Sequence, residues 1–103
     1  KMVQGCRSSG LITADALVHT GRCKLISIHA SNLHPSDASI IAVYDNTAAS
    51  GKVVSKFVVP GINDAGGNGL SPTLEFDMHG VICENGLYVD ITNGTPNLTV
   101  EFA

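Results

Sequence analysis

Residues 74–78 have the sequence Leu-Glu-Phe-Asp-Met, in which apolar and acidic side chains alternate. Successive side chains of a β-strand point to opposite faces, so the alternation places Leu74, Phe76 and Met78 on one face and two carboxylates on the other. A strand with one face in a core and one face in water is typical of antiparallel sheets. The segment therefore predicts a half-buried strand of an antiparallel sheet.

The same period of two recurs on both sides of this segment, in short apolar runs separated by Gly, Asn, Asp and Pro. Spacings of about ten residues between such runs are typical of two packed sheets. We therefore predict an all-β fold, an antiparallel β-sandwich or jelly roll of about seven to eight short strands. The other predicted strands lie around Leu17 and Val18, at Arg22–Asn32, Ser39–Asp45, Lys52–Val59, Val81–Cys83 and Leu87–Ile91, and around Leu98–Phe102.

Two details of strand placement follow from the same pattern. Strict alternation puts Ile26 on the same face as Ile28. Lys52 and Lys56 mark their strand as a sheet edge guarded by charge, because lysines on an edge discourage pairing with other chains.

The dipeptide Asn85-Gly86 separates Val81–Cys83 from Leu87–Ile91. Asn-Gly readily adopts the two positive φ angles of a type I′ turn. The sequence therefore predicts a β-hairpin at this place.

A chain of 103 residues is long enough for one hydrophobic core. The polar start of the chain predicts an N-terminal arm at residues 1–10, followed by a single sandwich domain at residues 11–103. Residues 63–72 are rich in glycine and predict a long surface loop, a type of segment that often carries the function of a β scaffold.

Charged residues make up only 15% of the chain, against about 25% in typical domains. Interface cores are poor in charge, so this composition favours a surface that is partly covered by other protein. The net charge of −3 and the scattered basic residues disfavour nucleic acid as a partner. No apolar run approaches the ~20 residues of a membrane-spanning helix, so no membrane partner is expected.

No combination of residues predicts a catalytic, cofactor-binding or metal site. The four histidines lack metal-ligand spacing, and His29 with Asp37 and a serine lacks the context of a serine nucleophile. The three cysteines match neither a disulfide framework nor a zinc motif, so buried free thiols are the favoured interpretation. A bridge between the sheets that joins Cys23 to Cys83 is the alternative in an oxidising compartment.

Three phrases of the sequence occur together in a group of small virion proteins. They are VHTGRCKLISIH at residues 18–29, VYDNTAASG at residues 43–51 and NGLYVDI at residues 85–91. In these phrases the chain resembles the small β-sandwich structural proteins of tailed phages, especially those of marine and cyanobacterial hosts. The phrases are strand and turn signatures and contain no catalytic motif.

The resemblance implies a capsid decoration or cement protein without enzymatic activity or cofactor. Such a protein is expected on the outside of the virion, as a homotrimer bound to the major capsid protein. Contacts with the lattice or between subunits are expected from the arm and from the glycine-rich loop, at Lys1, Met2, Val3, Gln4, Asn63, Asp64, Asn68 and Leu70.

Two other functions stay open at this point. The first is a receptor- or glycan-binding module on a phage tail fibre or spike, for which Tyr44 and Tyr88 are the plausible sugar platforms. The second is a host-derived carbohydrate-binding module, which the small number of aromatic residues disfavours.

Overall fold

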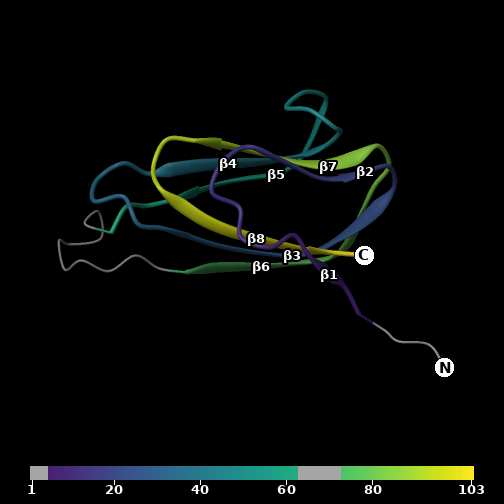
Figure 1. Ribbon diagram of the computed structural model, residues 1–103, viewed down its shortest axis with the longest axis horizontal. Helices are drawn as coiled ribbons and strands as arrows, with labels where there is room; N and C mark the ends of the chain where they lie inside the picture. The colour runs from purple at the N-terminus through teal and green to yellow at the C-terminus, as the bar shows by residue number, and fades with distance from the viewer. Residues whose placement is uncertain (1–4, 63–72) are drawn as a thin grey trace.

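A computed structural model describes residues 5–62 and 73–103, which form two antiparallel four-stranded sheets packed face to face (Figure 1). We call the sheet with strand order β1-β8-β3-β6 sheet A, and the sheet with order β2-β7-β4-β5 sheet B. The all-β prediction is confirmed. The strands are β1 (Arg7–Ser8), β2 (Ala16–Thr20), β3 (Cys23–Asn32), β4 (Ser39–Asp45), β5 (Lys52–Val59), β6 (Leu74–Cys83), β7 (Gly86–Thr92) and β8 (Pro96–Phe102).

Consecutive strands alternate between the two sheets, with one exception. Among the described strands, only β4 and β5 both follow each other in the chain and pair with each other. Two four-stranded sheets connected in this way are a jelly roll, one of the two architectures that the sequence predicts. The prediction that the Lys52–Val59 strand is a sheet edge is also confirmed, because β5 ends the order of sheet B.

The core lies between the sheets and is built from alternate positions of the strands. Leu74, Phe76 and Met78 pack against it while Glu75 is exposed, as the alternation predicts. Burial of one aliphatic side chain stabilises the fold by about 1.5–3 kcal/mol. The buried cluster consists of Ile12, Cys23, Leu25, Ile28, Ala30, Ile41, Val43, Val59, Cys83, Leu87, Val89, Leu98, Val100 and Phe102.

A β-bulge interrupts the alternation of β3. The register of β3 shifts between Leu25 and Ser27 against both of its neighbours, β6 and β8. Leu25 and Ile28 are both fully buried, although they are three positions apart. The prediction that Ile26 shares a face with Ile28 is therefore wrong, because the extra residue of a bulge moves the following side chains to the opposite face.

The predicted hairpin around Asn85-Gly86 is also wrong. The strand before it, β6, belongs to sheet A, and the strand after it, β7, belongs to sheet B. Neither Asn85 nor Gly86 has a positive φ angle. Positive φ angles occur instead at Asn93 (63°) and Gly94 (76°), where the chain passes from β7 to β8.

Close packing, and not turn geometry, explains the glycine at position 86. A Cβ atom there would lie 2.8 Å from the carbonyl oxygen of Asn46 and 2.9 Å from that of His19. Real Cβ atoms do not approach backbone atoms so closely, so only glycine fits. The sequence pattern Asn-Gly thus has a structural reason that differs from the one that a hairpin implies.

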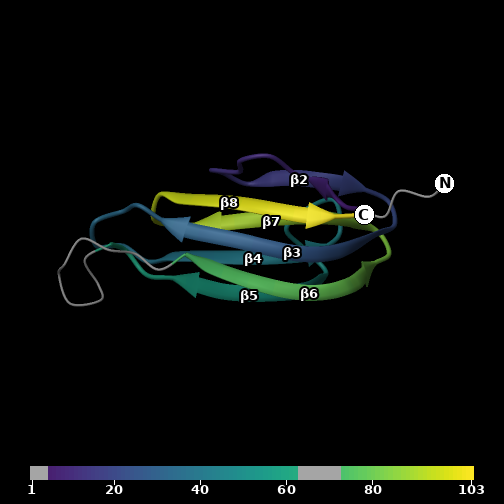
Figure 2. The ribbon, with the colours of Figure 1, turned by 90° about the horizontal axis from the view of Figure 1, so that it is seen from below.

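The N-terminal segment closes one side of the sandwich. In the described part of the predicted arm, Arg7 and Ser8 pair with β8, so this part belongs to sheet A. Ile12 then forms an isolated bridge with Leu98 and is only 6% exposed. The opposite side of the sandwich is formed by β5 and β6, which lie next to each other in Figure 2.

Candidate functional site

All the contact residues expected from the sequence lie outside the described residues. They are Lys1, Met2, Val3 and Gln4 in the arm and Asn63, Asp64, Asn68 and Leu70 in the glycine-rich loop. The candidate sites described below come from the outer faces of the two sheets.

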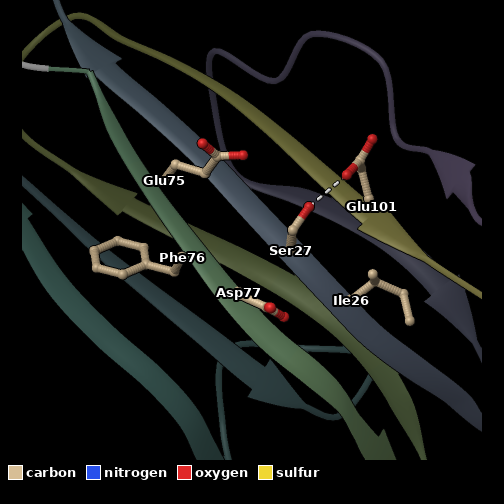
Figure 3. Close-up of a pocket in the computed structure, with 6 residues that line it drawn as sticks. All are labelled: Ile26, Ser27, Glu75, Phe76, Asp77 and Glu101. Carbon is tan, nitrogen blue, oxygen red and sulfur yellow. Dashed lines mark hydrogen bonds between the residues drawn. The ribbon is translucent and has the colours of Figure 1, made fainter.

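A polar cluster covers the outer face of sheet A at the β3 bulge. The Ser27 hydroxyl donates a hydrogen bond of 2.5 Å to Oε1 of Glu101. His29 lies between two carboxylates, with Nδ1 3.6 Å from Oε2 of Glu75 and Nε2 3.6 Å from Oε1 of Glu101. Figure 3 shows Glu75 of β6 and Glu101 of β8 on either side of Ser27 in β3. The cluster therefore joins three neighbouring strands.

A shallow depression of about 440 Å³ lies over this cluster, lined by Ser27, Asp77 and Glu101 among others. The hydrogen bond from Ser27 lowers the pKa of the Glu101 carboxyl, and the bond from His29 lowers it further. A carboxylate that accepts such bonds is stabilised in its charged form. The depression is therefore acidic.

In this cluster a serine, an imidazole and a carboxylate lie next to one another, as they do in the active site of a serine hydrolase. Their hydrogen bonds, however, differ from those of such an enzyme. Ser27 Oγ is 3.5 Å from Nε2 of His29, at the outer limit of a hydrogen bond. The hydroxyl proton goes to Glu101 at the shorter distance of 2.5 Å. In a hydrolase the imidazole accepts the serine proton. These contacts link neighbouring strands of sheet A and do not align Ser27 as a nucleophile.

The histidines have separate surroundings. His34 lies 3.6 Å from Asp37, the carboxylate of the triad that the sequence analysis rejected for His29, and His79 lies 3.6 Å from Asp77. Within residues 5–62 and 73–103, no group of three or more His, Cys, Asp or Glu side chains is arranged to hold a metal ion.

An apolar row crosses the outer face of sheet B from one edge to the other. Leu17 on β2 is opposite Tyr88 on β7, Tyr88 is opposite Tyr44 on β4, and Tyr44 is opposite Val53 on β5. Leu17 and Val53 are 49% and 45% exposed, and both tyrosines are half-buried. We call these four residues the sheet B row. The two tyrosines named from the sequence as sugar platforms are thus neighbours.

The cysteines differ from the sequence interpretation in two respects. Cys6 is exposed, so the expectation of a buried thiol is wrong for this residue. Cys23 and Cys83 are buried free thiols that face each other within sheet A, so a bridge would join two strands of one sheet and not the two sheets. Burial raises the pKa of Cys83 to about 11 and also raises that of Cys23.

The sequence contains no local signal for either site. Ser27 and Glu101 are separated by 74 positions, and the bulge that brings Ser27 to its place has no sequence mark. The sheet B row depends on the register of three strand pairs, which alternation alone does not fix. The candidate residues could be named one by one, but their grouping required the structure.

Comparison with protein-family models, with curated proteins and with solved structures finds no match to this chain. In the described part of the chain, no helix has the length and apolar character needed to cross a membrane.

Proposed function

We propose that this protein is a non-enzymatic structural protein of a virus particle. In this role it binds the outer surface of the shell formed by the major capsid protein and stabilises that shell. A protein that binds only the assembled shell shifts the assembly equilibrium toward it by mass action. The proposal needs a docking surface and no catalytic residue.

The sheet B row is the observation that carries the proposal. Tyrosine is enriched at protein interfaces because its ring buries a large area while its hydroxyl keeps a hydrogen bond. The row spans the whole width of sheet B and ends in exposed Leu17 and Val53. It is therefore a continuous apolar strip suited to contact with another protein.

The fold and the phage-like phrases support the same proposal at the level of analogy. Jelly rolls occur in viral capsid proteins and in lectins. All three phrases fall on described strands and turns, from β2 to β3, at the end of β4 and at β7. Because a fold hosts many functions, this support is weaker than that of the row itself.

A glycan-binding module of a tail fibre or spike is the second candidate. The observation in its favour is the pairing of β4 with β7, which places Tyr44 and Tyr88 directly opposite each other on the outer face of sheet B. Rings on an exposed face are platforms on which sugars stack. The location of the protein in the particle separates the two candidates.

The first experiment is a reconstruction of intact particles of the virus that encodes this chain, at a resolution that distinguishes side chains. We expect density for the jelly roll on the shell, with the sheet B row against the major capsid protein. Density at the tail alone would favour the glycan-binding function. Absence of the protein from particles would overturn both.

The second experiment measures occupancy of the shell by variants. The double variant Y44S/Y88S should bind fewer shells than the wild type, whereas Thr99→Ala, on the outer face of sheet A, should bind equally well. Deletion of residues 1–4 tests the expected contacts at Lys1, Met2, Val3 and Gln4 without removing β1. Unchanged occupancy of Y44S/Y88S would remove the row from the proposal.

A further inference from the structure

Two long strand edges lie together on one side of the sandwich. β5 has 8 residues and ends sheet B, and β6 has 10 residues and ends sheet A. In the described ranges, neither strand has a neighbour on its outer side. Such an edge presents a row of backbone N–H and C=O groups that can pair with another strand.

The core is incompletely covered on this side. Phe57 of β5 and Phe76 of β6 are in contact, with ring centroids 4.8 Å apart, yet both are only partly buried. On the opposite side, Ile12 covers part of the core and is 6% exposed, while Ala16 and Val18 of β2 stay partly buried. The inward side chains that stay partly buried along β5 and β6 are Val54, Phe57, Leu74, Phe76 and Met78.

Large apolar side chains are also exposed near the two edges. On β5, Val58 is 54% exposed, and on β6, Val81 and Ile82 are 39% and 43% exposed. Together with the partly buried rings, they give this side of the molecule the composition of an interface core.

The directions of the two strands fit a two-fold axis. β5 and β6 run in opposite directions along this side, as the arrows in Figure 2 show. Rotation by half a turn about an axis parallel to the strands brings sheet A of a second copy beside sheet B of the first. β5 of each copy then lies antiparallel to β6 of the other, and both edges are covered in one closed contact.

The same symmetry fixes the register, because this rotation does not move residues along the strands. Phe57 and Phe76 are at the same level, since their rings touch. Phe57 of one copy therefore faces Phe76 of the other. Because the strands are antiparallel, the residue before Phe57 on β5 lies opposite the residue after Phe76 on β6. Lys56 therefore faces Asp77 of the other copy.

This register pairs opposite charges. Lys56 and Asp77 are both exposed on the outer faces of their sheets, and those faces become continuous in the pair. Glu75 of the second copy is the diagonal neighbour of Lys56 and lies within reach of its ammonium group. Opposite charges across strands stabilise a pairing, and like charges oppose it.

We propose that the protein forms a two-fold symmetric dimer in which β5 of each copy pairs with β6 of the other. Each four-stranded sheet then continues into a sheet of the second copy, and the four rings of Phe57 and Phe76 meet near the axis. The charge of Lys56 disfavours pairing of β5 with strands that offer no opposite charge and favours pairing with the strand that carries Asp77. The edge is therefore selective for its partner. The dimer does not depend on the proposed function, and it differs from the trimer implied by the phage-like phrases.

Sedimentation equilibrium of the full chain tests the stoichiometry. We expect a mass of twice 10.7 kDa at micromolar concentration. A monomer throughout the concentration range, or a trimer, would overturn the dimer.

Charge reversal tests the register. K56E and D77K each place like charges at both contacts, so each should raise the Kd of the dimer roughly 30-fold. Arg7→Glu makes the same change of charge on β1, at the opposite edge of sheet A, and should leave the Kd unchanged. Circular dichroism of the variants confirms that they are folded.

A mixture of the two reversed variants is the decisive measurement. In a dimer of K56E with D77K, a glutamate faces a lysine at one contact and the native pair faces at the other. We therefore expect the mixture to form dimers at concentrations where each variant alone is monomeric. Folded variants that stay monomeric when mixed would rule out this register and the proposal with it.

Discussion

The carboxylate of Asp45 accepts a hydrogen bond of 2.8 Å from the backbone N–H of Asn85, 40 positions away in the chain. It accepts a second bond, of 3.0 Å, from the N–H of Glu84. Asp45 ends β4 in sheet B, and Glu84 and Asn85 connect β6 to β7. One carboxylate therefore fixes the place where the chain crosses from sheet A to sheet B.

This contact predicts a pH dependence of stability. The bonds from Asn85 and Glu84 lower the pKa of Asp45. A lowered pKa in the folded state stabilises the fold above the ordinary aspartate value of about 3.9, and this stabilisation is lost as the pH falls through the folded-state pKa. We expect Asp45→Asn to lower the free energy of unfolding by about 2 kcal/mol at pH 7.

The difference between wild type and Asp45→Asn should shrink as the pH falls from 5 to 2, in denaturant unfolding followed by circular dichroism. Glu101→Gln serves as the comparison, because its carboxyl is more exposed and should contribute less. A difference that stays constant with pH would show that the charge of Asp45 does not contribute.

Gly86→Ala should destabilise the fold by about 3 kcal/mol or more, because the added methyl group meets the backbone oxygens of Asn46 and His19. Gly5→Ala is the matched control, since a Cβ atom there meets nothing within 4 Å. Thermal unfolding of both variants measures the effect. Equal melting temperatures would contradict the close packing at position 86.

Among the polar side chains, we expect removal of Asn32 to cause the largest loss of folding stability. It is fully buried, and its Nδ2 donates to the carbonyls of Asp37 (2.8 Å) and Val59 (3.0 Å). Its Oδ1 accepts from the N–H groups of His34 (3.1 Å) and Thr95 (2.9 Å). Asn32→Ala leaves these backbone groups without their partner and should cost about 3 kcal/mol or more.

Urea unfolding of Asn32→Ala beside Asn97→Ala measures this loss, because Asn97 lies on the outward side of β8. The control should stay within about 0.5 kcal/mol of the wild type. Similar free energies of unfolding for the two variants would mean that water replaces the hydrogen bonds of Asn32.

Ser39→Ala should raise the stability of the fold, in contrast to Asn32→Ala. The Ser39 hydroxyl is fully buried and has no hydrogen-bond partner among the described residues. Removal of a buried polar group without a partner relieves its desolvation cost, so we expect a gain of about 1 kcal/mol. A loss of stability in urea unfolding would reveal a partner for the hydroxyl in solution.

The thiols should react at different rates. Cys6 is exposed, whereas burial raises the pKa of Cys83 to about 11 and suppresses its thiolate. At pH 8, one thiol per folded chain should react fast with a disulfide reagent, and three should react in denaturant. Recovery of a single thiol in denaturant would indicate that Cys23 and Cys83 had formed a bridge.

The strands could be predicted because their signals are local. The alternation from Leu74 to Met78 needs no distant contact to be recognised, and the burial of its apolar side chains follows it. The bulge at Ser27 could not be predicted, because the shift in register depends on the pairing of β3 with β6 and β8, which are far away in the sequence.

The pairing of strands was the less predictable part. Asn85-Gly86 has the composition of a hairpin turn, but the packing of Gly86 against Asn46 and the bonds to Asp45 lead the chain into the other sheet. Tyr44 and Tyr88 were visible as candidates, and their adjacency followed only from the register of β4 and β7. The expected contacts in the arm and the glycine-rich loop lie outside the described residues.

The alternation of consecutive strands between the sheets has a kinetic consequence. β1 pairs with β8 and β2 pairs with β7, so the partners come from opposite ends of the chain. High contact order of this kind slows folding to milliseconds or seconds. Neither sheet can form or separate alone, because the strands of each sheet are distributed along the whole chain. The domain should therefore unfold in a single cooperative step, which follows from its topology and not from any one bond.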